Sequence, residues 1–371
     1  MLHEGKYSIL ALSASVAVGI PVDLTGSVVR YSWILTGISG TFLVGKGYKP
    51  LMKIALTGSI AYDYLMSFPG HFQEHILADK LESISLSFLV DKMIKRRGGV
   101  GPNIGYTMAL LGGDPVLFST VGQDFIEYRA WLEKKGVDTR GVQVIEDEFT
   151  ASFFATTDRD NCQISSFYPG AMSHAAQVKL ADWNEEPLDL VVISPTDPVA
   201  MNDYILEADH LKLPYVYDPS QQTVRLSGEE LRRGVEGAYA LFVNEYEFCL
   251  IEKHTGLAIE EINDLVEILV VTLGDQGSVI YANDEEYSIP VVMPENILDP
   301  TGVGDAYRGG FLTGLSYKME LPLCGQIGAL AASYCLETDG PQSHSYTPVE
   351  FIDRFRQHFD DKGKLEVLLK V

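Results

Sequence analysis

Short apolar runs alternate with helical stretches over most of this chain, and that alternation constrains the fold more than any other feature. Residues 190–195 (LVVISP) and 215–222 (YVYDPSQQ) each read as a strand that ends in a polar loop. Strands that are joined through helices run parallel in one sheet. Because 371 residues can bury a large core, the sequence predicts one large α/β domain with a lid.

Residues 299–312 read DPTGVGDAYRGGFL and place glycines at the start of a helix. Gly302 and Gly304 flank Val303, so several backbone N–H groups can point outward together and bind an anion. Asp305 closes the loop, where the helix dipole is expected to lower its pKa and keep it ionised. A carboxylate beside a bound phosphoryl group can take the proton of an attacking hydroxyl. A glycine-rich helix cap would give the same pattern, so the loop alone leaves both interpretations open.

The loop resembles the C-terminal signature of the ribokinase/PfkB family of sugar and nucleoside kinases, usually written D-T-x-G-A-G-D. The matching positions are Asp299, Gly302, Gly304, Asp305, Ala306, Gly309 and Gly310. Pro300 replaces the usual Thr and has no N–H to offer a phosphate, and Val303 replaces the usual Ala. The resemblance covers essentially everything after Met52. It implies a ribokinase-like three-layer α/β/α domain over residues 52–371, with β-sheet lid segments at about 62–92 and 149–170.

Several segments, among them GSIAYDYLMSFPG, SSFYPGAMS and DPSQQ, resemble the bacterial adenosine kinases. That likeness implies an ATP-dependent kinase that phosphorylates the 5′-hydroxyl of adenosine to give AMP. Asp305 would be the general base, and the backbone of Gly302, Val303 and Gly304 would be the anion hole. Two alternatives stay open: a sugar kinase of the ribokinase or fructokinase type, and a non-catalytic nucleoside sensor.

The segment RRGGVGPN resembles the family's N-terminal signature, G-G-x-x-x-N, which faces the substrate. Gly98 and Gly99 allow close backbone approach, Asn103 offers a donor and an acceptor, and a helix is expected over residues 104–112. Without the family, the segment would be a turn and a helix cap. Pro102 and Tyr307 differ from the residues that the bacterial adenosine kinases have at these positions. These differences leave the acceptor specificity open.

Asp63 follows the first strand after Met52, where a carboxylate is well placed for a ligand, although a capping role is nearly as common. The resemblance assigns it to the acceptor's hydroxyls and assigns Ser59 and Ser87 to the nucleoside. Residues 150–168 read as a hairpin with a turn at 158–161. The hairpin carries Phe153 and Phe167, which could sandwich a base or simply be buried in the lid.

Gln221 and Gln222 follow a strand and could bond an amide-like purine edge. Asn244 and Glu247 form N-x-x-E, a spacing that chance also gives on surface helices. In the family this pair helps to position Mg²⁺ and phosphates, and Glu247 would act through water. The resemblance also implies a nucleotide loop and a monovalent cation such as K⁺ near Asp299. The loop residues are Thr272, Gly274 and Gly277, for which a hairpin turn is the alternative.

The net charge of −23 argues against nucleic acid or an anionic membrane as a partner. The four cysteines lack C-x-x-C spacing, so neither a disulfide framework nor a zinc site is indicated, and a reducing, cytoplasmic compartment is expected. Exposed lid strands would need cover, which predicts a homodimer through the lid.

Residues 1–51 carry a net charge of +2, and their apolar patches are too short and too interrupted to span a bilayer. We expect this segment to be a dispensable, disordered or misassigned extension. His71 and His75 are four residues apart, but Pro69 and Gly70 argue against the helix that would bring them together as metal ligands.

Overall fold

A computed structural model describes residues 30–35, 38–43, 52–76, 82 and 85–370. The chain divides into one unit of Met1–Tyr48 with Lys370–Val371, and a second unit of Lys49–Leu369. In the first unit, β1 (Arg30–Leu35) and β2 (Ile38–Leu43) pair as an antiparallel hairpin. The rest of the prediction for residues 1–51 lies outside the described residues.

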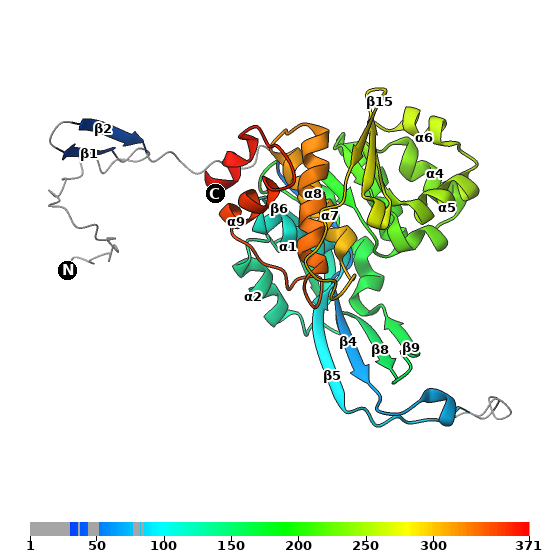
Figure 1. The fold of residues 1–371 in the computed structure, drawn as a ribbon. Coiled ribbons are helices and arrows are strands. Elements are labelled where there is room, and N and C mark those ends of the chain that lie inside the picture. Colours follow the sequence, from blue (N-terminus) through cyan, green and yellow to red (C-terminus); the bar gives the residue numbers. More distant parts are fainter. Residues whose placement is uncertain (1–29, 36–37, 44–51, 77–81, 83–84, 371) are drawn as a thin grey trace, which may run out of the picture. The chain divides into compact units, whose positions relative to one another are not determined.

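The second unit is built on a nine-stranded sheet of order β15-β14-β13-β12-β11-β10-β3-β6-β7 (Figure 1). The strands from β13 to β7 run parallel, and β14 and β15 are antiparallel at one edge. Every residue of β3 and β10 is buried, which explains why β10 is apolar throughout and β3 is apolar up to Thr57. The strands are β3 (Ile54–Thr57), β6 (Pro115–Gly122), β7 (Val142–Ile145), β10 (Leu190–Ile193), β11 (Tyr215–Tyr217), β12 (Ala240–Asn244), β13 (Ile268–Thr272), β14 (Ser278–Ala282) and β15 (Glu285–Ile289).

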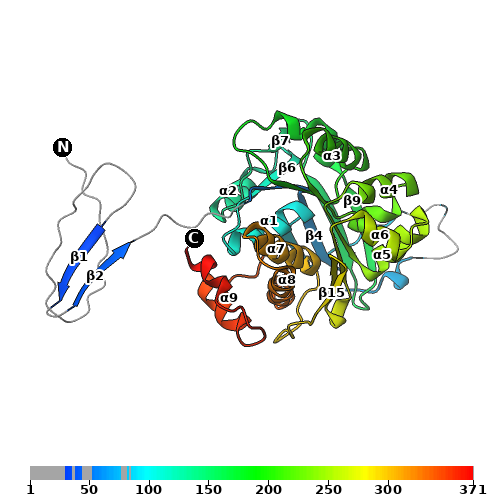
Figure 2. The ribbon, with the colours of Figure 1, turned by 90° about the horizontal axis from the view of Figure 1, so that it is seen from above.

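Helices cover both faces of this sheet, so the predicted three-layer α/β fold is confirmed (Figure 2). One face packs against α1 (Val100–Leu110), α2 (Ile126–Lys134), α7 (Val303–Ser316), α8 (Leu321–Leu336) and α9 (Pro348–Phe355). The other packs against α3 (Pro198–Leu211), α4 (Gly228–Glu236), α5 (Glu245–Thr255) and α6 (Ile259–Leu265). Short 3₁₀ helices lie at Phe72–Glu74, Gly170–Gln177, Leu180–Asp182, Ser220–Val224, Gly274–Gln276 and Lys364–Lys370.

A second sheet of four strands, here called the small sheet, extends from the large one (Figure 1). Its order is β5 (Lys92–Gly98), β4 (Ala61–Ser67), β8 (Ala151–Thr157) and β9 (Gln163–Tyr168). The hairpin expected over residues 150–168 is therefore confirmed. Arg96, Asp63, Phe153 and Phe167 are partners in register across the four strands. Because side chains of register partners share one face, the small sheet presents a cation, a carboxylate and two aromatic rings in one row.

One helix prediction needs correction. The first signature helix begins at Val100 instead of residue 104, because Pro102 falls in the first turn, where a missing N–H costs nothing. At the other end of the domain, α9 ends at Phe355. Gly363, with φ of +75°, then separates α9 from the last 3₁₀ helix. No helix among the described residues is long and apolar enough to cross a membrane.

Candidate active site

A cavity of about 340 Å³ lies at the carboxyl ends of the parallel strands. Ser59 follows β3, Pro195 follows β10, and Asp305 comes from the first turn of α7. This is the edge at which open α/β sheets bind ligands. The lining residues are Ser59, Ala61, Asp63, Gly99, Val100, Asn103, Phe167, Met172, Pro195, Gln221, Gln222, Arg225, Thr301, Gly302 and Asp305.

The N-terminus of α7 opens into this cavity. Gly302 is its N-cap, with φ of +78°, and an added Cβ there would lie 2.3 Å from Pro341 Cβ, so only glycine fits. The N–H groups of the first turn have no acceptor within the helix, which leaves them available to an anion. The Val303 N–H also makes a long 3.4 Å contact with Pro300 O. Of the three predicted donors, Val303 is thus partly engaged in the turn.

Asp305 lines the cavity and is held by Asn103, whose Nδ2 donates to Asp305 Oδ2 over 2.8 Å. Burial raises the pKa of Asp305 to about 7, although Arg308 and the Asn103 hydrogen bond lower it. The expectation that the helix dipole would lower this pKa is therefore wrong, because the loss of water outweighs the dipole. A carboxylate with a pKa near neutrality is suited to act as a general base.

A buried chain of hydrogen bonds fixes Asn103 in turn. Gln342 Nε2 donates to Asn103 Oδ1 at 2.7 Å and lies 2.6 Å from the hydroxyl of Tyr128. The Tyr128 hydroxyl donates to the carbonyl of Gly98 over 3.0 Å. Gln342 and Tyr128 thus connect the two ends of the first glycine signature, Gly98 and Asn103, and the sequence analysis singled out neither of them. A loop glutamine and a helical tyrosine carry no sequence signal for this role.

Arg308 and Asp218 are a second pair that the sequence analysis missed. Arg308 lies one turn after Asp305, and its Nη2 contacts Asp218 Oδ1 at 2.6 Å. Ser194 Oγ donates to the other oxygen of Asp218 over 3.0 Å, and burial raises the pKa of Asp218 to about 6. An added Cβ at Gly304 would lie 2.8 Å from Arg308 Nη1, so the guanidinium lies against the first turn of α7. Two sequence features could have indicated this pair. Asp218 directly follows a strand, and Arg308 is the one basic residue of the otherwise mostly apolar helix α7.

The acceptor residues predicted from the sequence divide into two groups. Those that line the cavity are Ser59, Asp63, Gly99, Asn103, Phe167, Gln221 and Gln222. Gly98 does not line it but lies against Asp63, since an added Cβ there would be 2.8 Å from Asp63 Oδ2. Ser87 does not line the cavity either: it is exposed and precedes Phe88, which packs on the rings of Phe68 and Phe72, so its role in binding the nucleoside stays a prediction.

The geometry of β8 and β9 bears on the two roles that the sequence left open for Phe153 and Phe167, and it does not favour a sandwich around a base. The two residues are direct partners in the β8–β9 ladder, so their side chains are neighbours on one face. Neighbours in a ladder form one wall of a site and cannot enclose a ring between them. Phe167 lines the cavity and is 49% exposed, which leaves its face free for stacking.

The predicted nucleotide residues lie farther along the same sheet edge, outside the cavity. Asn244 and Thr272 are register partners at the ends of β12 and β13. Asn244 and Glu247 form a capping box of α5: Glu247 N donates to Asn244 Oδ1, and Asn244 N donates to Glu247 Oε2. Gly274 (φ of +62°) has open space around its Cβ position, whereas Gly277 (φ of +90°) would clash with Ile289 O.

A family profile and several relatives match this chain. Residues 64–348 match the pfkB family of carbohydrate kinases. The chain belongs to the PfkB family. A nucleoside kinase of Methanocaldococcus jannaschii is 30% identical over 308 residues, which cover 82% of this chain and 97% of that protein. The resemblance to bacterial adenosine kinases therefore holds at the level of the family, since this relative is a nucleoside kinase.

Solved structures agree with this assignment and confirm a ribokinase-like fold. A Burkholderia thailandensis nucleoside kinase in complex with inosine has a TM-score of 0.74 at 33% identity, covering 82% of this chain and 98% of the other. Its complex with ADP-inosine has a TM-score of 0.72 at 36% identity, covering 82% and 96%. The adenosine kinase of Sinorhizobium meliloti, at 20% identity and a TM-score of 0.64, covers 83% of this chain and 100% of its own and shares the fold.

The metal ligands predicted for this PfkB kinase fare differently. Glu247 is buried, faces Arg308 and Asp218, and keeps one oxygen outside its capping box, which fits a water-mediated magnesium contact. Asp299 is already paired with a cation of the protein, the guanidinium of Arg96. Its Oδ2 accepts from Arg96 Nη1 at 2.6 Å, and its Oδ1 accepts from Thr301 N at 2.9 Å.

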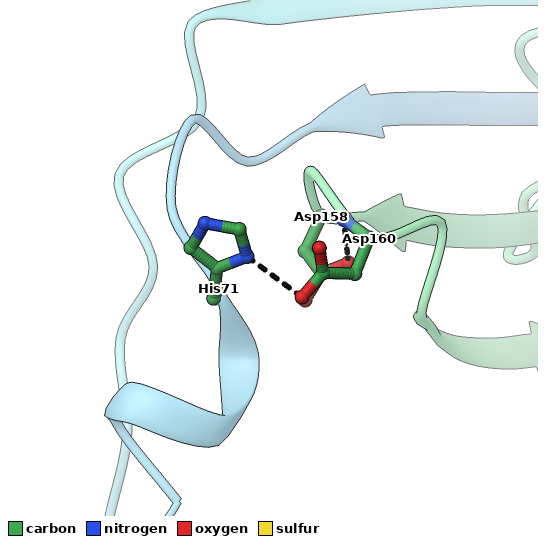
Figure 3. A group of neighbouring side chains, drawn as sticks. All are labelled: His71, Asp158 and Asp160. Carbon is green, nitrogen blue, oxygen red and sulfur yellow. Dashed lines mark hydrogen bonds and ion pairs between the residues drawn. The ribbon is translucent and has the colours of Figure 1, made fainter.

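His71 lies close to the carboxylates of Asp158 and Asp160, whereas the sequence analysis had considered His75 as its partner (Figure 3). Its Nδ1 lies 2.8 Å from Asp160 Oδ2, whereas the ring of His75 packs edge-on against Phe68. Asp158 accepts N–H groups from Phe72, Asp160 and Cys162, and these donors hold its pKa below the usual range. Because its two oxygens accept these three hydrogen bonds, Asp158 stabilises the turn at the end of the small sheet and is poorly suited to bind a metal.

Tyr307, a departure from the comparison, does not reach the acceptor. It is buried, and its hydroxyl lies 2.7 Å from Ser278 Oγ. The extra oxygen thus joins α7 to β14.

Proposed function

We propose that this PfkB-family kinase transfers the γ-phosphoryl group of ATP to the 5′-hydroxyl of a purine nucleoside, adenosine included. One observation carries the proposal: Asp305 lies in the cavity at the N-terminus of α7, held by Asn103. A base with a pKa near neutrality beside free N–H groups provides both a proton acceptor and an anion site.

The residues divide the work of transfer. Ionised Asp305 accepts the proton of the 5′-hydroxyl as its oxygen attacks the γ-phosphorus and the bond to ADP breaks. The first-turn N–H groups of α7 and the adjacent Arg308 stabilise the charge on the transferring group. Glu247 would hold a magnesium ion through a water molecule, and that ion would supply positive charge to neutralise the phosphates. The small sheet excludes water, so ATP is not hydrolysed.

The two ends of the cavity favour a nucleoside over a sugar. Asp63 and Gly99 offer polar contacts for ribose hydroxyls, whereas Phe167 offers a flat apolar face for a base. Gln222 Nε2 donates to Thr196 O over 2.6 Å, while its Oε1 is buried and has no partner among the described residues. That oxygen can accept from the amino group of adenine or the N1–H of a 6-oxopurine. The inosine complex of the B. thailandensis kinase supports this reading.

A panel of acceptors tests the proposal. ADP release in a coupled assay and thermal shift are measured with adenosine, inosine, guanosine, cytidine, ribose and fructose, with ATP and Mg²⁺ present. We expect turnover with purine nucleosides and a Tm increase that grows with the ratio of ligand concentration to Kd. Preferred turnover of ribose or fructose would instead establish a sugar kinase. Purine nucleoside binding without ADP release from any acceptor would establish a sensor.

We further propose a cytoplasmic enzyme that forms a homodimer through the small sheet. ATP is a cytoplasmic substrate, and Cys162 and Cys249 are exposed free thiols, as a reducing compartment allows. The edge strand β9 is exposed along its whole length and carries Ile164, which is 45% exposed. A second copy would cover this edge.

A further inference from the structure

Arg96 joins the loop at Asp299, to which the resemblance assigns a monovalent cation, to the loop that follows α8. Its Nη1 donates to Asp299 Oδ2 over 2.6 Å, and its Nη2 pairs with Asp339. An added Cβ at Gly340 would lie 3.3 Å from Arg96 Cδ, so the arginine stem packs on the loop that follows α8. Only 17% of the Arg96 side chain and 12% of the Asp299 side chain are exposed. Water therefore screens this ion pair weakly.

The guanidinium lies among three carboxylates, one of which, that of Asp63, lines the cavity. Besides Asp299 and Asp339, it faces Asp63, its register partner on β4. Under the proposed function, Asp63 binds the acceptor's hydroxyls, and the loop that begins at Asp299 leads to the N-terminus of α7, which receives the γ-phosphate of ATP. Without a cation, three negative charges would oppose the approach of a polyanion. Arg96 is the cation that the described structure provides there.

We propose that Arg96 takes the place of a monovalent cation in this kinase, so that phosphoryl transfer needs no added K⁺ or Na⁺. A monovalent ion beside Asp299 would lie next to the guanidinium of Arg96, a like charge that water screens weakly because both side chains are largely buried. A guanidinium also binds through directed N–H donors and so fixes the orientation of the carboxylate, which a spherical ion cannot do. Because Asp299 begins the loop that leads into α7, Arg96 acts as a positioning residue for the anion site.

Arg96 belongs to β5, which gives the proposal a second consequence. The positive charge reaches the site as part of the small sheet, which also carries Asp63 and Phe167. Acceptor binding and placement of the charge are therefore coupled through one rigid element. A freely exchanging ion would not have this coupling.

The test has two readouts, because the activity readout rests on the proposed function. Thermal unfolding and kcat/KM are measured in KCl, NaCl, CsCl and choline chloride at equal ionic strength. The proposal expects the wild type to show the same Tm and the same kcat/KM in all four salts. An increase in either quantity that is specific to K⁺ or Na⁺ would overturn it. If no acceptor is phosphorylated, the proposed function fails, while the Tm series still decides the question of the cation.

Arg96→Ala and Arg97→Ala are matched variants from neighbouring positions of β5. The Arg97 guanidinium lies 4.8 Å from the Trp131 ring, so its removal deletes the same charge from the other face of the strand. We expect Arg96→Ala to lose at least about tenfold in kcat/KM, since it leaves buried charge unpaired. Millimolar guanidinium should partly restore both activity and Tm in Arg96→Ala and in neither the wild type nor Arg97→Ala.

Arg96→Lys is a second variant that keeps the proposal testable if Arg96→Ala fails to fold. It keeps the charge but loses the two-armed geometry, so we expect intermediate activity that is still independent of K⁺. Equal activity of Arg96→Ala and Arg97→Ala would contradict the proposal. The proposal would also be contradicted if Arg96→Ala and Arg96→Lys lost kcat/KM to the same extent and no added cation restored the activity of Arg96→Ala.

Discussion

Asn103 donates a hydrogen bond to Asp305 over 2.8 Å, although 202 residues separate them in the chain. The bond joins the first turns of α1 and α7, which carry the two glycine signatures. It orients one carboxylate oxygen and leaves the other for the substrate. The position of the base therefore depends on a residue that is distant in the sequence but in contact in the folded domain.

Replacing Asn103 with Ala should lower kcat about 10- to 100-fold. The loss arises because Asp305 is left without its donor and Gln342 without its acceptor. Steady-state kinetics with the best purine nucleoside measure it, and the KM for ATP should change less than kcat. Unchanged kcat in a folded variant would remove Asn103 from the positioning role.

The pH profile of kcat/KM should show an acid limb near pH 7. Asp305 must be ionised to accept a proton, and burial raises its pKa to about 7, so activity falls as the pH drops through that value. Burial also raises the pKa of Asp63 to about 6, which steepens the loss at lower pH. A profile that is flat from pH 5 to 8 would contradict the assignment.

The variant Arg308→Gln tests whether the acid limb of the pH profile belongs to Asp305. The groups that face Asp305 are Arg308, which lowers its pKa, and Asp218 and Glu247, which raise it. Loss of the guanidinium should therefore move the limb to higher pH, in addition to lowering kcat. Arg233→Gln, at an exposed position on α4, is the control that should leave the limb in place.

Asp305→Asn should unfold at a higher temperature than the wild type, and the difference should be larger at pH 8 than at pH 5. The folded pKa of Asp305 lies above the unfolded value of about 4, so the folded state holds the proton more tightly. The free energy of unfolding consequently falls as the pH rises from about 4 to 7, and Asn removes that loss. A gain of about 2–4 °C at pH 8 is expected in calorimetry. A lower Tm at pH 8 would contradict it.

Light scattering should show a particle of twice the chain mass at micromolar concentration. Ile164→Lys would place a charge on the exposed edge strand β9 and shift the particle to the monomer. A monomeric wild type would end the proposal of a homodimer through the small sheet.

The sequence predicted the elements whose chemistry is local. Uninterrupted apolar runs predicted buried parallel strands, and the glycines of the loop before α7 predicted a helix N-terminus open to an anion. Gly302 was identified correctly as part of that loop because its role depends on its own backbone.

The remaining parts of the site depend on contacts between distant segments. The pKa of Asp305 is set by burial, which no local pattern reveals. Ser87 was assigned by resemblance, yet it lies with an aromatic cluster outside the cavity. Arg96 contacts Asp299 only because the small sheet folds against the loop before α7, so its sequence neighbourhood on β5 gives no sign of its partner.

The most direct test of the central claim is single-turnover phosphoryl transfer by Asp305→Asn. Asp353→Asn makes the same chemical change at an exposed position on α9 and serves as the control. The account predicts that Asp305→Asn binds ATP and the purine nucleoside normally but loses at least about 10²-fold in rate, while Asp353→Asn matches the wild type. Transfer by Asp305→Asn at a rate close to that of the wild type would show that Asp305 is not the base.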